Sequence, residues 1–228
     1  MSVAEAQDYS SLRARMVSEV EAMYADTRAE TGLAAMSPAV RAAMGKVERH
    51  RLVADGHRGA AYRNHPLPIG SGQTISQPYI VALSTDLLGL TGSSVVLDVG
   101  TGSGYQAAVL AEIAAKVYSI EIIPSLGNEA RKRLEELGYG NIEVRIGDGY
   151  QGWPEKAPFD AIVVTAAAPQ VPPALIAQLK PGGRMVIPVG SSGGIQYLML
   201  IEKRADGGVD ERRVLPVRFV PLVPRTGG

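Results

Sequence analysis

The feature that most constrains the fold of this chain is an apolar run that ends in glycines at alternate positions. Residues 95–99 are mostly β-branched, and Gly100, Gly102 and Gly104 follow them. The next run, residues 107–111, has the composition of a helix. This order predicts a strand, a tight turn and a helix. Glycines let the backbone approach a ligand closely, and a helix start presents unpaired N–H groups, so the unit is typical of a nucleotide-binding loop.

The spacing of the glycines separates two classes of such loops. The dinucleotide fingerprint G-x-G-x-x-G needs its third glycine where Tyr105 stands, whereas the glycine comes one residue earlier, at Gly104. An NAD-dependent oxidoreductase is therefore disfavoured. The pattern G-x-G-x-G after a strand resembles the loop of Rossmann-like, class I AdoMet-dependent methyltransferases. Taken alone, the loop is also compatible with an ordinary turn of an α/β protein.

A second strand candidate strengthens the nucleotide interpretation. Residues 117–122 are largely apolar and deliver Glu121 about twenty residues after the loop, where a carboxylate can accept hydrogen bonds from ribose hydroxyls. A solvated carboxylate at the end of a strand is the alternative. The loop and the acid together favour a nucleotide site more strongly than either does alone.

Strand and helix patterns then alternate along the chain. Helices are expected over residues 125–137 and 173–179, strands over 142–149, 159–167 and 184–189, and a turn over 180–183. Residues 197–201 and 214–222 lack a helix between them, and the turn residues 206–208 predict an antiparallel hairpin. The expected fold is α/β: a mostly parallel, doubly wound sheet with a C-terminal hairpin. We expect one domain overall, with an N-terminal helical segment over residues 1–65 packed on a core over 66–228.

The N-terminal segment shows helical patterns and no metal-binding pattern. Apolar residues at helical spacing predict one amphipathic helix over residues 11–31 that stops near Gly32. Ser37 followed by Pro38 predicts the start of a second helix. Three histidines lack a ligand-type spacing with carboxylates, so no metal site is expected at His50, His57 or His65.

The composition narrows the classes of partner. Of 228 residues, 23 are Lys or Arg and 23 are Asp or Glu, so no net charge attracts a nucleic acid. The absence of cysteine excludes disulfides, a thiolate nucleophile and cysteine metal sites. The N-terminal residues lack a basic-then-apolar signal pattern, and no apolar run has membrane-spanning length. We expect a cytoplasmic monomer without nucleic-acid or membrane partners.

Residues 66–79 form the second unusual stretch, in which prolines and glycines impose an irregular path. Ser76, followed by Pro78 and an apolar run, predicts the N-cap of a helix that extends toward Leu88. A simple cap would contribute about 1 kcal/mol. A hydroxyl beside a helix N-terminus is also a favourable carboxylate site, because the free N–H groups and the helix dipole both favour an anion.

In an open parallel sheet, ligands lie beyond the carboxyl ends of the strands. This rule gathers the glycine loop, Glu121, Asp148 with Gly149, and residues 165–168 around one crevice. Asp148 is suited to accept a hydrogen bond from an adenine amino group, or it is a turn aspartate before a glycine. Residues 165–169 lack the Asn/Asp-Pro-Pro-aromatic motif of base amino methyltransferases, and no acidic metal ligand follows that strand before Glu202.

Several blocks of sequence, in order, resemble the protein-L-isoaspartate O-methyltransferase family. They are PLPIG at 66–70, QTISQP at 73–78, GTGSGYQ at 100–106, GDGYQGW at 147–153, PFDAI at 158–162, LKPGG at 179–183 and RFVPL at 218–222. The resemblance extends from about Ser37 to Leu222. It departs from the family pattern over residues 47–53, and at Ile122, where the family often has an arginine.

The resemblance implies methyl transfer from AdoMet to the free α-carboxylate of L-isoaspartyl residues in damaged proteins and peptides. The ester then collapses to a succinimide that can reopen to aspartate. Ser76 is implied to be the active-site serine. The implied cofactor residues are Thr74, Ile75, Gly100, Thr101, Gly102, Ser103, Gly104, Glu121, Asp148, Gly149 and Thr165. The implied peptide-binding residues are Pro68, Ile69, Gln77, Arg218, Phe219 and Val220.

The implied reaction needs no general base, which explains why the sequence shows no catalytic pair such as His-Asp. A carboxylate with a pKa of about 4 is already ionised at neutral pH, so positioning can carry the catalysis. Holding two reactants in a near-attack geometry is worth roughly 7–11 kcal/mol. Two alternatives stay open at this point: a carboxyl methyltransferase with another peptide substrate, and a non-catalytic AdoMet-binding module.

Overall fold

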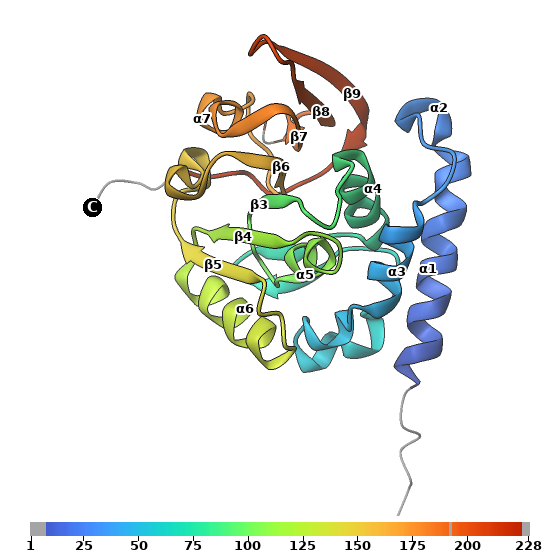
Figure 1. Cartoon of the computed structure of the whole chain (residues 1–228). Coiled ribbons are helices and arrows are strands. Elements are labelled where there is room, and N and C mark those ends of the chain that lie inside the picture. The colour runs from blue at the N-terminus through green and yellow to red at the C-terminus, as the bar shows by residue number, and fades with distance from the viewer. Residues whose placement is uncertain (1–7, 192, 225–228) are drawn as a thin grey trace, which may run out of the picture.

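A seven-stranded sheet forms the centre of the molecule, with the strand order β5-β4-β3-β6-β7-β8-β9 (Figure 1). The computed structural model describes residues 8–191 and 193–224, so the N-terminal residues 1–7 lie outside the described part. The strands of this sheet are β3 (Val95–Val99), β4 (Lys116–Glu121), β5 (Ile142–Ile146), β6 (Phe159–Val164), β7 (Leu179–Val189), β8 (Gln196–Lys203) and β9 (Val209–Val217). A separate two-stranded hairpin consists of β1 (Leu67–Gly70) and β2 (Gln73–Ile75).

The pairing of the strands confirms the predicted fold class. The strands β5, β4, β3, β6 and β7 run parallel, and β8 and β9 are added antiparallel at the far edge. The prediction of a separate turn over residues 180–183 is wrong, because these residues belong to β7. Phe159 pairs with Leu179 while Ala161 pairs with Arg184, so the extra residues form an irregularity within one strand.

The helices follow the predicted alternation with shifted ends. They are α1 (Tyr9–Asp26), α2 (Arg28–Thr31), α3 (Pro38–Lys46), α4 (Pro78–Leu88), α5 (Tyr105–Ala111), α6 (Pro124–Glu136) and α7 (Pro173–Ala177). Short 3₁₀ turns are η1 (Arg49–Arg51), η2 (Asp55–Ala60), η3 (Gly149–Gln151) and η4 (Pro154–Lys156). No helix within the described residues has the length and apolar character of a membrane-crossing segment.

The predicted single helix over residues 11–31 is divided in two. Thr27 interrupts it, because its Oγ1 donates to the Met23 carbonyl at 2.8 Å and its backbone leaves the helical conformation. The second piece, α2, ends at Gly32, which adopts a left-handed conformation with φ +77°. The start predicted at Ser37 is confirmed, since its side chain accepts from the Val40 N–H at 3.3 Å.

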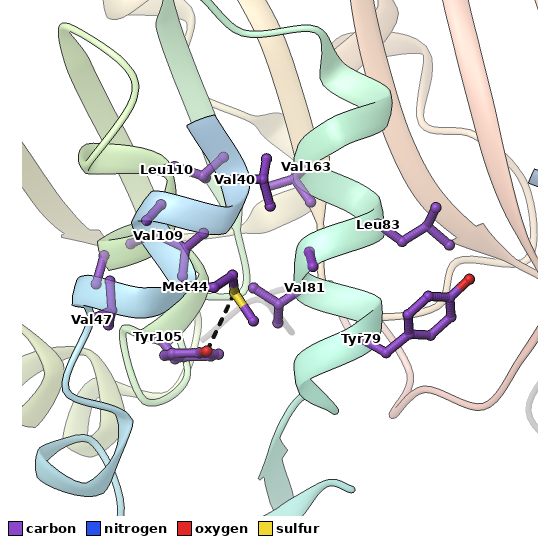
Figure 2. Packing of buried hydrophobic residues seen from close by; sticks show 14 of the residues in the cluster. Val40, Met44, Val47, Tyr79, Val81, Leu83, Tyr105, Val109, Leu110 and Val163 are labelled. Atoms are coloured by element: carbon purple, nitrogen blue, oxygen red, sulfur yellow. Dashed lines mark hydrogen bonds between the residues drawn. The ribbon is translucent and has the colours of Figure 1, made fainter. Parts of the chain in front are cut away.

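Apolar residues alternate between the two faces of the sheet and so form two cores. Val96 of β3 belongs to a core that includes residues of α1, α3, α4 and α5, whereas its neighbour Leu97 belongs to the core of the other face, which includes Leu175 of α7. Figure 1 shows α1, α3 and α4 on one side of the sheet. Figure 2 shows α3, α4 and α5 meeting in the first core, where the Tyr105 hydroxyl donates to the Met44 sulfur at 3.5 Å. The N-terminal helices therefore share a core with the sheet.

Candidate active site

The glycine loop leaves β3 through backbone conformations that L side chains rarely adopt. Gly100 has φ +101°, and a Cβ there would lie 2.4 Å from Thr165 Oγ1. Gly104 has φ +87°, and a Cβ there would lie 3.1 Å from Leu134 Cδ1 of α6. Gly100 is thus required for close contact with the end of β6, and Gly104 for the packing of α5 against α6.

Glu121 ties the glycine loop to the end of β4. Its Oε2 accepts from the Gly102 N–H at 2.8 Å, and its Oε1 accepts from the Ile123 N–H at 3.0 Å. The residue is buried, with 6% of its surface exposed. The solvated carboxylate considered as an alternative is therefore wrong, because both oxygens are engaged by backbone donors.

A buried polar network lies under the loop. Thr101 Oγ1 and Ser119 Oγ are 2.6 Å apart, and Ser119 Oγ donates to Asp98 Oδ2 at 2.7 Å. Asp98 is fully buried, and its Oδ1 has no hydrogen-bond partner among the described residues. Burial, helped by the nearby charge of Glu121, raises the pKa of Asp98 to about 7, although the bond from Ser119 acts in the lowering direction.

Asp98→Asn is expected to change how stability depends on pH. The folded protein holds the Asp98 proton more tightly than the unfolded chain, whose aspartates have a pKa of about 4, so this residue costs stability as pH rises from about 4 to about 7. Asparagine removes that cost. The variant's free energy of unfolding relative to wild type is therefore expected to increase by about 2–3 kcal/mol between pH 5 and pH 8. Urea denaturation without AdoMet measures it, and a pH-independent difference would contradict the assignment.

Two cavities open at the carboxyl ends of the parallel strands. The first, here called the loop crevice, is lined by Gln73, Thr74, Val99, Gly100, Gly102, Ile120, Glu121, Ile122, Ile123, Gly149, Thr165, Ala166, Val220, Pro221, Leu222 and Val223. The second, the α4 cavity, has a volume of about 450 Å³ and is lined by Pro66, Thr74, Ser76, Gln77, Ile80, Thr165, Pro216, Val217, Arg218, Phe219 and Val220. Thr74, Thr165 and Val220 line both, so the two cavities share a wall.

The N-terminus of α4 opens into the α4 cavity without the expected cap. Ser76 is not the N-cap; Gln77 is, and its side chain makes no capping bond. The side-chain acceptor comes instead from Asn64, whose Oδ1 accepts from the Tyr79 N–H at 3.0 Å. Among the described residues no acceptor is found for the Ile80 N–H. The Ser76 side chain and this first turn therefore face the cavity together.

The structure brings most of the sequence-derived residues to the two cavities. Those that lie on a cavity wall are Thr74, Ser76, Gln77, Gly100, Gly102, Glu121, Gly149, Thr165, Arg218, Phe219 and Val220. Thr165 follows the end of β6, and its Oγ1 donates to the Gly100 carbonyl at 2.7 Å. This bond connects the end of β6 with the glycine loop.

The other sequence-derived residues line neither cavity. Ile75 is 2% exposed and pairs with Leu67, so its side chain belongs to the core. Ser103 Oγ accepts from the Tyr105 N–H at 3.2 Å, and Asp148 Oδ1 accepts from the Tyr150 N–H at 2.8 Å, so both make local turn contacts. The remaining four are Pro68, Ile69, Thr101 and Gly104.

These four have contacts of their own. Thr101 belongs to the network with Ser119, and Gly104 packs on Leu134. Pro68 is exposed on β1. A Cβ at Gly102 would lie 3.3 Å from Ile69 Cδ1, which places that side chain over the glycine loop.

The end of β9 and the segment after it contribute residues that sequence reasoning missed. Pro216 and Val217 line the α4 cavity, and Pro221 and Leu222 line the loop crevice. Residues 218–222, here called the C-terminal strap, cross both cavities. The Ala167 N–H donates to the Val220 carbonyl at 2.8 Å, which fixes the strap beside the end of β6. The sequence signal for the strap was the RFVPL block at 218–222, from which only Arg218, Phe219 and Val220 were assigned to the site.

The departures from the family pattern fall in different places. Ile122 lines the loop crevice. The block over residues 47–53 lines neither cavity. Within it, Arg49 is fully buried, its guanidinium carbon lies 4.5 Å from the Tyr105 ring centroid, and burial lowers its pKa to about 10. Its Nε donates to the Ala61 carbonyl at 2.8 Å, so Arg49 links the segment before β1 to Tyr105 of α5.

Of the three histidines, His50 makes a packing contact and His65 is exposed. The His50 ring stacks on Tyr9 with centroids 3.9 Å apart, and burial lowers its pKa. The described residues contain no group of three or more metal-ligating side chains that could hold an ion.

Comparison with known proteins identifies relatives over nearly the whole chain. The family model described as Protein-L-isoaspartate(D-aspartate) O-methyltransferase matches residues 19–227. Protein-L-isoaspartate O-methyltransferase 2 of Polaromonas sp. is 60% identical over 207 residues, covering 91% of this chain and 98% of the relative. Protein-L-isoaspartate O-methyltransferase 1 of Nitrosospira multiformis is 61% identical over 217 residues, covering 95% and 89%.

Solved structures agree with these relatives. A protein-L-isoaspartate O-methyltransferase superimposes with a TM-score of 0.81 at 28% identity, over 95% of this chain and 66% of the other. A putative protein-L-isoaspartate O-methyltransferase from Plasmodium falciparum, solved with S-adenosyl-L-homocysteine, gives a TM-score of 0.74 at 25% identity, over 96% and 99%.

Proposed function

This chain belongs to the protein-L-isoaspartate O-methyltransferase family, and from that premise we propose how its two cavities divide the reaction. The enzyme methylates isoaspartyl residues of damaged proteins, with AdoMet as the methyl donor. In our proposal the loop crevice holds AdoMet and the α4 cavity holds the isoaspartyl residue. The observation that carries it is the shared wall of Thr74, Thr165 and Val220, where two reactants would meet.

The residues of the loop crevice fit AdoMet. Gly100 lies on the crevice wall and carries no side chain, so its backbone is open to close approach by a ligand. Glu121 lies on the crevice wall, and each of its oxygens retains a lone pair for a ribose hydroxyl beside the backbone bond it already accepts. AdoMet, when bound, supplies an electrophilic methyl group on a positively charged sulfur. In this proposal Gly149 borders the adenine end, and Asp148 acts by shaping that turn.

The α4 cavity suits a carboxylate. The Ser76 hydroxyl and the Ile80 N–H are donors at the start of an α-helix whose dipole favours an anion. The substrate carboxylate is ionised at neutral pH, so no residue has to remove a proton. We propose that Ser76 and the first turn of α4 hold one carboxylate oxygen and leave the other directed at the methyl group. Gln77, Arg218 and Phe219 are proposed to border the flanking peptide.

Ser76→Ala is expected to lower kcat by about tenfold to a hundredfold while AdoMet affinity stays within about twofold, because it removes one positioning donor. The assay uses labelled AdoMet and two peptides that differ only in L-isoaspartate against L-aspartate, with base-labile methyl ester as the readout. Wild type is expected to label the isoaspartyl peptide alone. Ser93→Ala, on the surface before β3, is the matched control.

Two outcomes would contradict this assignment. If Ser76→Ala abolished AdoMet binding while single-turnover chemistry survived, Ser76 would belong to the cofactor site. If wild type labelled neither peptide although AdoMet bound, the α4 cavity would take a different carboxyl substrate.

We further propose that the enzyme acts as a monomer in the cytoplasm. Among the described large apolar side chains, Ile195 and Val223 are the exposed ones. Two side chains do not supply the roughly 800 Å² per partner that a stable interface buries. Light scattering after gel filtration tests the oligomeric state, and cell fractionation tests the compartment. The balance of 23 basic and 23 acidic residues supports the proposal that the partners are isoaspartyl proteins rather than nucleic acids or membranes.

A further inference from the structure

The C-terminal strap forms part of the α4 cavity wall after it has left the sheet. The last paired residue of β9 is Val217, which lies opposite Gln196, the first residue of β8. The β8–β9 ladder ends at Val217, and the next backbone pairing of the strap in the described residues is the isolated bridge of Pro221 with Ala167. Arg218, Phe219 and Val220, which lie between, all line the cavity. Something other than the regular sheet ladder must therefore fix this backbone.

The side chain of Gln196 replaces the missing strand partner. Its Oε1 accepts from the Phe219 N–H at 2.6 Å, and its Nε2 donates to the Phe219 carbonyl at 3.2 Å. Both polar groups of one backbone residue are thus satisfied by one amide side chain. Gln196 is itself buried, with 5% of its surface exposed. It makes no direct contribution to the wall of either cavity.

The neighbouring anchor of the strap is independent of Gln196. The Val220 carbonyl accepts from the Ala167 N–H at 2.8 Å, and the Leu222 N–H donates to the Ala167 carbonyl at 2.7 Å. These bonds hold the half of the strap that borders the loop crevice. Removal of the Gln196 amide would therefore release Phe219 while leaving residues 220–222 attached.

We propose that Gln196 is a positioning residue that sets the affinity for the isoaspartyl peptide by fixing the backbone of Phe219. This inference rests on the proposed function, in which the α4 cavity is the peptide site. The consequence is a separation of effects. Loss of the amide disorders the peptide side, whereas the AdoMet side keeps the anchor at Ala167.

The chain contains a matched control for the loss of such an amide. Gln178 is also buried, with 8% exposed; its Oε1 accepts from the Trp153 N–H at 2.7 Å and its Nε2 donates to the Gln151 carbonyl at 2.8 Å. Neither Gln178 nor its two partners line a cavity. A variant at Gln178 thus removes the same kinds of bond, at similar burial, away from the proposed peptide site.

The experiment compares Gln196→Ala, Gln178→Ala and Phe219→Ala in the full chain, using one isoaspartyl peptide. Loss of two buried hydrogen bonds is expected to lower the melting temperature of both glutamine variants. Of the two glutamine variants, only Gln196→Ala is expected to raise the peptide KM, by about tenfold. Its kcat and AdoMet Kd are expected to stay within about threefold of wild type. Phe219→Ala is expected to raise the peptide KM as well. If the alanine variants do not fold, Gln196→Met and Gln178→Met keep the side-chain volume and remove the same bonds.

The outcomes separate this inference from the proposed function. If Phe219→Ala raises KM and the Gln196 variant does not, the role of Gln196 is wrong and the peptide site stands. If both glutamine variants raise KM equally, the effect is general loosening and the inference is overturned. If Phe219→Ala also leaves KM unchanged, the proposed peptide site fails and the inference fails with it.

Discussion

Gly100→Ala is expected to weaken AdoMet binding by about a hundredfold or more. A left-handed backbone conformation costs an alanine about 1–2 kcal/mol. The new Cβ would also lie 2.4 Å from Thr165 Oγ1, an atom that donates to the Gly100 carbonyl at 2.7 Å and the Val99 carbonyl at 3.1 Å. The strain and the disturbed bonds are expected to move the loop away from the conformation that fits AdoMet. If restoring that conformation on binding costs about 3 kcal/mol, the Kd rises by a factor of about a hundred. Calorimetric titration with AdoMet measures the loss.

Two companion variants separate the causes. Gly92→Ala is the control, because a Cβ there would meet nothing within 4 Å and its φ is not in the left-handed range. The double variant Gly100→Ala/Thr165→Ala removes the clashing hydroxyl and keeps the strained φ. Its AdoMet Kd is expected to be lower than addition of the two single losses would predict, because the clash that weakens Gly100→Ala is absent from the double variant. AdoMet binding by Gly100→Ala at near wild-type strength would exclude the loop crevice as the cofactor site.

The parts of the structure that the sequence predicted are those encoded locally. The strand over residues 95–99, the three loop glycines and Glu121 depend on apolar runs and turn residues that lie close together in the chain. The carboxyl ends of parallel strands meet at one edge, so the crevice followed from the order of the strands. The C-terminal hairpin was equally local, with Gly207 at φ +86° in its turn.

The contacts that the sequence did not reveal join distant segments. The cap of α4 comes from Asn64 rather than from Ser76, because the chain folds back before the β1-β2 hairpin and brings a remote amide to the helix start. The anchoring of Phe219 by Gln196 likewise joins separate segments, the start of β8 and the strap after β9. Neither contact leaves a pattern in a short window of residues.

The direction of individual side chains was the second feature that the sequence did not predict. Residues 74–76 were all assigned to the site, yet Ile75 on β2 points into the core while its neighbours line a cavity, as alternation along a strand requires. The same applies to Thr101, which lies next to two loop glycines but joins the buried network with Ser119. A motif match assigns whole blocks, whereas only the backbone geometry decides which members face the ligand.

Glu121→Gln is expected to raise the AdoMet Kd by about a hundredfold, although the two side chains have nearly the same shape. Each carboxylate oxygen accepts one backbone N–H, from Gly102 and from Ile123. Glutamine offers one acceptor and one donor, so one of these N–H groups would face an NH₂ group. A buried donor left unpaired costs about 1–3 kcal/mol, and the loop would shift away from the geometry that fits AdoMet. Glu202→Gln, which alters a surface pair with Arg184, is the control.

A second readout distinguishes loss of the charge from disruption of the fold. Glu121 contributes to the raised pKa of Asp98, so Glu121→Gln should lower that pKa from its value of about 7, while burial keeps it above the ordinary range. Carbon-13 NMR of the Asp98 carboxyl measures the shift. A higher AdoMet Kd together with a lower Asp98 pKa would show that the charge of Glu121 acts on both the loop and the buried network. An unchanged Kd would show that the Gly102 and Ile123 contacts do not organise the cofactor site.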